Sequence, residues 1–69
     1  MSKMIKVYEE EILKIEYQTL NDNFTDEQDS EAALFAAFFE GINPTMISIN
    51  ENDFEVSENN EIRISSLMR

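Results

Sequence analysis

The chain has no cysteine and no histidine, and its 69 residues include a single glycine and a single proline. Without cysteine it can form neither disulfides nor thiolate metal sites, and without histidine it lacks the side chain most used for proton transfer near neutral pH. One glycine is too few for a glycine-rich loop that binds phosphate. The sequence therefore predicts a protein with no catalytic, cofactor-binding or metal-binding residues.

Carboxylates are abundant enough to raise two remaining possibilities, an acid–base pair and a calcium site. A catalytic pair needs a partly dry pocket, and a domain of this size has little interior left once its own core is filled. An EF-hand register beginning at Asn21 places Asp26 at the sixth position, where glycine is needed, and Ala32 at the twelfth, where glutamate is needed. We therefore expect neither an enzyme nor a specific calcium-binding protein.

Long apolar runs are also missing. No segment approaches the roughly 20 residues of a membrane span, and the residues after Met1 lack the continuous apolar stretch of a signal peptide. A formal charge of −10 would be repelled by nucleic acid and by anionic lipid, so we expect direct binding to neither. The length predicts one domain, residues 1–69, and the absence of cysteine favours the cytoplasm.

Positive charge is absent from a long central interval. No lysine or arginine lies between Lys14 and Arg63, yet this interval holds twelve of the 15 carboxylates. Ordinary soluble surfaces mix both signs, because like charges repel one another and weaken the compact state. This asymmetry predicts a negative field directed at a basic partner.

The clearest predicted element is a helix within residues 25–42. Thr25 and Gln28 have the spacing of a capping box, Gly41 suits a helix C-cap, and Pro44 prevents continuation. On a helical projection the large apolar residues share one arc, which we expect to face the core, with the alanines on the opposite side. The arc contains Leu34, Phe35, Phe38, Phe39 and Ile42, and the alanines are Ala32, Ala33, Ala36 and Ala37.

Apolar and polar residues alternate within residues 45–67, which predicts half-buried strands. Asparagine-rich segments at residues 50–52 and 58–60 supply the turn chemistry between them. The alternating apolar pairs are Ile47 and Ile49, Phe54 and Val56, and Ile62 and Ile64. A three-stranded antiparallel meander is the expected result.

Residues 4–20 fit both a helical and an alternating pattern. We favour two strands, roughly 3–9 and 12–20, because two glutamates would otherwise lie on the apolar side of a helix. The objection is that residues 9–11 are three glutamates, without the glycine or asparagine of a tight turn. The predicted fold class is α+β, a single small domain with an antiparallel sheet packed on one Phe/Ala-rich helix in the order ββαβββ; the alternative is ααβββ.

Carboxylates alternate along the middle strand of the predicted meander. Alternate side chains project from one face of a strand about 6.6 Å apart, close to the spacing of about 6.8 Å between every second phosphate of a DNA strand. Neighbouring carboxylates extend this row, and a second cluster lies at the start of the helix. The predicted partner-binding residues are Glu51, Asp53, Glu55, Glu58, Glu61, Asp26, Glu27 and Asp29.

This row predicts an acidic inhibitor that mimics nucleic acid and occupies the basic nucleic-acid-binding surface of another protein. Small acidic proteins that phages and mobile elements use against restriction, CRISPR or DNA-repair enzymes act in this way, and the analogy rests on size and charge. The alternative is a non-enzymatic protein–protein interaction module or adaptor, with a homodimer as one form. Its candidate contact residues are Met4, Tyr8, Tyr17, Met46, Leu67 and Met68.

Overall fold

The structure is a computed structural model, and it describes residues 2–20, 23–50 and 52–64. The order ββαβββ is confirmed, and the alternative with two N-terminal helices is wrong. The elements are β1 (Lys3–Glu9), β2 (Ile12–Thr19), α1 (Asp26–Phe39), β3 (Met46–Ile49), β4 (Asn52–Val56) and β5 (Ile62–Ile64).

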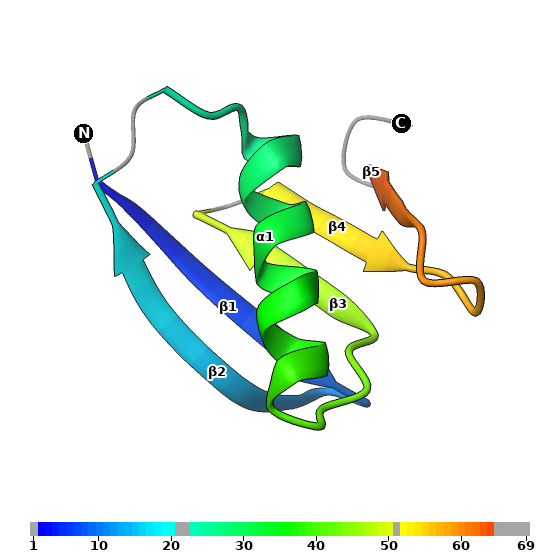
Figure 1. Cartoon of the computed structure of the whole chain (residues 1–69). Helices are drawn as coiled ribbons and strands as arrows, with labels where there is room; N and C mark the ends of the chain where they lie inside the picture. The colour runs from blue at the N-terminus through cyan, green and yellow to red at the C-terminus, as the bar shows by residue number, and fades with distance from the viewer. Residues whose placement is uncertain (1, 21–22, 51, 65–69) are drawn as a thin grey trace.

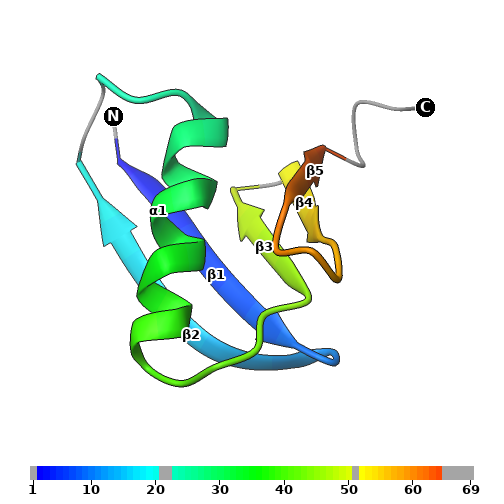
Figure 2. The same ribbon diagram turned by 45° about the vertical axis from the view of Figure 1, so that its right-hand side comes forward.

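The five strands form one antiparallel sheet in the order β2-β1-β3-β4-β5, and α1 lies across one of its faces (Figure 1). The predicted meander of β3, β4 and β5 is confirmed, and β1 joins it by pairing with β3. The N-terminal hairpin and the C-terminal meander therefore share one sheet. Seen from the side, α1 forms a single layer over that sheet, and no described element covers the opposite face (Figure 2).

The turn between β1 and β2 consists of glutamates in an unusual backbone conformation. Glu10 and Glu11 adopt left-handed φ angles of 51° and 72°, which cost a residue with a side chain roughly 1 kcal/mol each. Neighbouring hydrogen bonds hold the turn: Glu10 N donates to Thr45 Oγ1 at 3.0 Å, and Thr45 N donates to Tyr8 O at 2.8 Å. The connection between α1 and β3 thus supports a turn that lacks favourable residues.

The core lies between α1 and the central strands. β1 contributes Ile5 and Val7, and β3 contributes Ile47 and Ile49, all with side chains almost fully buried. Phe54 on β4 extends the same layer, with Ala33, Leu34 and Ala37 above it on the helix. The alternation predicted from the sequence thus places the apolar residues of β3 and β4 that the sequence singled out, Ile47, Ile49 and Phe54, toward the helix.

Both ends of α1 match the sequence prediction. Thr25 Oγ1 accepts a hydrogen bond from Gln28 N, and Gln28 Oε1 accepts one from Thr25 N, which completes the capping box. At the other end Gly41 has a φ of 77°, and Ile42 N donates to Ala37 O at 2.9 Å. This left-handed ending lets the chain reverse toward β3.

The predicted core face of α1 was mostly wrong. Phe35 and Phe39 are 70% and 93% exposed, and Phe38 is 38% exposed, whereas Ala33 and Ala37 are fully buried. Leu34 is buried as expected, and Ile42 packs against the edge of the core. The β-branched side chains of the sheet already fill the space beneath the helix, so close packing requires small side chains on the helix.

Candidate partner-binding surface

The predicted acidic row lies on the open face of the sheet. Asp53 and Glu55 on β4 are exposed, and Phe54 between them is buried under the helix. Their partners on β3 are Ser48 and Met46, which belong to the same open face. The two carboxylates therefore project together into solvent, as the alternation predicts, while the predicted first member of the row, Glu51, lies outside the described residues.

The turn between β4 and β5 continues this acidic surface. Glu58 and Glu61 are both exposed, and Ser57 N donates to Glu61 O at 2.8 Å, which holds the two sides of the turn together. Arg63 on β5 pairs in register with Glu55 and places one cation within the row. Four predicted carboxylates, Asp53, Glu55, Glu58 and Glu61, thus gather around the β4–β5 hairpin.

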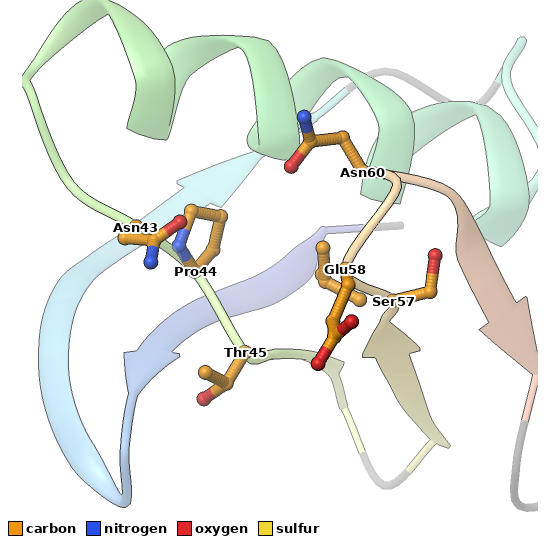
Figure 3. A pocket seen from close by; sticks show the side chains of 7 residues that line it. Asn43, Pro44, Thr45, Ser57, Glu58 and Asn60 are labelled. Atoms are coloured by element: carbon orange, nitrogen blue, oxygen red, sulfur yellow. The ribbon is translucent and has the colours of Figure 1, made fainter.

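A small open cleft lies beside this hairpin. It has a volume of about 240 Å³ and is bounded by the connection between α1 and β3 on one side and by the β4–β5 turn on the other (Figure 3). Its lining residues are Asn43, Pro44, Thr45, Val56, Ser57, Glu58 and Asn60. Glu58 is the single ionisable side chain in this lining, so the cleft offers no pair of groups for acid–base chemistry.

The cluster at the start of the helix is organised around Lys3. Lys3 Nζ lies 2.9 Å from Asp26 Oδ1 and 2.8 Å from Asp29 Oδ2, and it also donates to Phe24 O at 2.9 Å. The hydrogen bonds to Asp29 and Asp26 raise the pKa of Lys3 above its ordinary value, despite the opposing effect of burial. The ammonium group therefore ties the start of β1 to the first turn of α1.

Asp26 and Asp29 play mainly internal roles in this arrangement. The hydrogen bond from Lys3 lowers the pKa of Asp26 below its ordinary value, although partial burial opposes the shift. Asn52 Nδ2 donates to Asp26 Oδ2 at 3.2 Å, and this hydrogen bond also lowers the pKa of Asp26. Asp29 is 4% exposed, so its carboxylate faces Lys3 and not a partner, and we exclude it from the candidate surface.

Asp29 also affects a neighbouring residue on β2. Burial raises the pKa of the Tyr17 phenol, and the negative charge of Asp29 adds to this shift. Sequence analysis missed this interior polar group, although one signal was present: Lys3 has the same strand parity as Ile5 and Val7, which points it toward the helix. A lysine on the apolar face of a strand predicts a buried carboxylate nearby.

The two predicted acidic clusters do not form one surface. Glu27 is exposed on α1, on the helix side of the sheet, whereas Asp53 and Glu55 project from the opposite side. The hydrogen bond between Asn52 and Asp26 places the start of β4 next to the start of α1, whereas Glu58 lines the cleft beside the connection that follows α1. The β4–β5 carboxylates are therefore the coherent candidate site, and Glu27 lies outside it on the helix side of the sheet.

Aromatic side chains on α1 form a second exposed feature that sequence analysis assigned to the core. A shallow hollow of about 330 Å³ separates the helix from β5. Its lining residues are Glu31, Leu34, Phe35, Phe38, Asn60 and Ile62. Exposed apolar patches of this kind commonly mark contact surfaces in small proteins.

These features define a class: a small α+β domain with one helix on a five-stranded antiparallel sheet, an acidic hairpin and an exposed aromatic helix face. No protein-family model matches the chain, and neither a curated protein nor a solved structure shows significant similarity to it. Within the described ranges, no group of three or more potential ligand side chains is arranged to hold a metal ion. The helix found there is not long and apolar enough to cross a membrane.

Proposed function

We propose that the protein is a non-catalytic inhibitor that uses the acidic β4–β5 hairpin to occupy a basic, nucleic-acid-binding surface of another protein. The observation that carries the proposal is the placement of Asp53, Glu55, Glu58 and Glu61 on one hairpin, all exposed to solvent. Phosphate-binding grooves are rich in lysine and arginine and attract such a row electrostatically.

The geometry of the row supports mimicry of a phosphate backbone. Asp53 and Glu55 are alternate residues of an extended strand, so their separation of about 6.6 Å approaches that of every second phosphate. Both carboxylates are exposed on the open face of the sheet, where Asp53 pairs in register with Ser48 and Glu55 pairs with Met46. The proposed partner is therefore a basic protein and not nucleic acid itself.

A capture experiment tests this function. We would immobilise the wild-type protein, expose it to a cell lysate at low salt and elute the bound proteins with a double-stranded DNA oligonucleotide. Proteins released by DNA should be nucleic-acid-binding proteins, and their retention should fall steeply as salt concentration rises. The double variant Asp53→Lys, Glu55→Lys should lose them, because it replaces attraction with repulsion.

The matched control is Glu10→Lys, Glu11→Lys, which changes the net charge equally at the β1–β2 turn, outside the β4–β5 hairpin. This control should retain the DNA-eluted proteins, and circular dichroism should show that both double variants remain folded. If the β4 variant captures the same proteins as the wild type, the carboxylates on β4 do not form the binding surface. If both variants lose them equally, overall charge is responsible and the hairpin is not.

The exposed phenylalanines favour a second candidate function, a protein–protein interaction module that relies on apolar contact. Phe35 and Phe39 project from α1 with most of their surface in water, and aromatic residues dominate the energetics of many interfaces. Proteins captured through this face should remain bound at high salt. The variant Phe35→Ser, Phe39→Ser should release them without affecting the proteins eluted by DNA.

A further inference from the structure

Backbone hydrogen bonds fix both walls of the cleft beside the β4–β5 hairpin. Val56 N donates to Thr45 O at 3.1 Å, which joins the end of β4 to the connection between α1 and β3. Within the β4–β5 turn, Asn60 N donates to Ser57 O at 2.9 Å, and Asn60 has a left-handed φ of 65°. The cleft is therefore formed before any partner arrives, and a preformed site loses less conformational entropy when it binds.

The lining of the cleft contains a negative charge and no positive one. All of its residues lie between Lys14 and Arg63, in the interval that lacks lysine and arginine. Glu58 is exposed on the turn and makes no ion pair within the described residues. Figure 3 shows its side chain between Thr45 on one wall and Ser57 on the other. A group that enters the cleft therefore meets an uncompensated carboxylate.

A second carboxylate lies behind the opposite wall. Glu9 Oε1 accepts a hydrogen bond from Asn43 N at 3.2 Å, so the end of β1 adds negative charge beside the connection between α1 and β3. Concave sites lined by one sign of charge attract groups of the other sign. The cleft therefore favours a cation over a neutral or anionic group.

The other lining residues suit a cation with an apolar stem. Pro44 is buried and Val56 is half-buried, so both offer apolar surface, whereas the amides of Asn43 and Asn60 can present oxygen atoms. Arginine combines an apolar stem with a planar head that carries several N–H donors. The volume of about 240 Å³ is smaller than the roughly 300 to 1,000 Å³ of small-molecule pockets, and it suits one such side chain.

We propose that this cleft binds the guanidinium group of one arginine side chain, with Glu58 as the anionic contact and the amide oxygens of Asn43 and Asn60 as further acceptors. A guanidinium can donate to both walls at once, whereas the ammonium group of lysine is compact and more strongly hydrated. The proposal rests on the inhibitor function only for the owner of this arginine, which is the basic partner protein. The affinity of the cleft for a guanidinium can be measured without that partner.

A titration with a small probe tests the site. We would add N-acetyl-L-arginine methylamide to the ¹⁵N-labelled protein at constant ionic strength and follow the backbone amide signals by NMR. The signals of residues 43, 45 and 56–60 should shift to saturation, with a Kd of about 1 to 10 mM. The uncharged citrulline derivative should bind at least about tenfold more weakly, because it lacks the charge that Glu58 recognises. The lysine derivative should also bind more weakly than the arginine derivative.

Two variants separate charge from shape. Glu58→Gln should weaken binding of the arginine derivative at least about tenfold, because it removes the carboxylate. Asn43→Phe should also weaken binding, because the larger side chain fills the cleft without changing the net charge. The matched control is Glu31→Gln, which removes one negative charge from an exposed position on α1 and should bind as the wild type does. The NMR spectra would also show that every variant is folded.

Several results would overturn the proposal. These are the absence of saturable shifts up to about 50 mM probe, equal affinity for the arginine and lysine derivatives, and wild-type affinity in Glu58→Gln. If the probe does not bind while Asp53 and Glu55 still capture DNA-eluted proteins, the guanidinium site is wrong and the inhibitor function stands. If the probe binds as expected and no such proteins are captured, the guanidinium site stands and the inhibitor function is wrong.

Discussion

The two sides of α1 differ in the size and the exposure of their apolar side chains. The side that faces the sheet carries Ala33 and Ala37, which have no exposed surface, and the outer side carries Phe35 and Phe39, which are mostly in water. A sheet rich in isoleucine and valine supplies most of the core volume. The small side chains of the helix let it pack close to that sheet. The comparison shows that the largest apolar residues of a helix do not always mark its buried side.

The strongest test of this comparison enlarges a buried alanine. Ala37→Leu should lower the free energy of unfolding by about 1 to 3 kcal/mol, because the added side chain must push α1 away from the sheet. Phe39→Ala is the control and should change stability by no more than about 0.5 kcal/mol. Urea denaturation of both variants would measure the difference. Equal losses of unfolding free energy in the two variants would contradict the assignment of Ala37 to the buried side of α1 and of Phe39 to the exposed side.

Phe38 lies at the boundary between the two sides of α1, so its substitution should have an intermediate effect on stability. It is 38% exposed and borders the hollow between α1 and β5, so Phe38→Ala should lower the free energy of unfolding by roughly 1 to 2 kcal/mol. Phe35→Ala, one turn earlier and more exposed, should cost clearly less. A loss of about 3 to 5 kcal/mol for Phe38→Ala would instead indicate a fully buried ring.

The smallest expected effect on stability concerns the start of the helix, where Asp26 and Asp29 pair with Lys3 and Glu27 faces solvent. The pKa of Asp26 is lowered in the folded state, so its contribution to stability is present above its ordinary value of 3.8 and is lost as pH falls below it. The raised pKa of Lys3 preserves the ion pair up to and beyond 10.5. Asp26→Asn should therefore reduce the melting temperature near neutral pH, and this deficit should shrink progressively as the pH falls below 3.8.

Glu31→Gln is the control for this pH dependence, because it removes one negative charge from an exposed position on the same helix. Its melting temperature should not show the selective loss near neutral pH expected for Asp26→Asn. Differential scanning calorimetry at several pH values would compare the two variants. A deficit for Asp26→Asn that persists unchanged into acid would exclude the ion pair with Lys3 as its cause.

Local signals were sufficient to predict much of the fold. The capping box at Thr25, the left-handed Gly41 and the alternation of Ile47 and Ile49 depend on nearby residues, and the structure confirms each of them. The row formed by Asp53 and Glu55 followed from the same alternation. These features were predictable because a short segment of chain determines them.

Features that depend on distant segments could not be predicted in this way. Both sides of α1 are apolar, so periodicity alone could not decide whether alanine or phenylalanine faces the sheet. The pairing of Lys3 with Asp29 joins residues 26 positions apart, and the turn at Glu10 is held by Thr45 from another connection. In each case the deciding contact forms only once the sheet and helix are assembled.

The small buried side of α1 has a consequence for how this protein can evolve. Because packing depends on Ala33 and Ala37, mutations at Phe35 and Phe39 carry little penalty for folding. Natural selection can therefore alter the outer side of the helix without first sacrificing a stable domain. Related chains should keep small residues at positions 33 and 37, while positions 35 and 39 change freely.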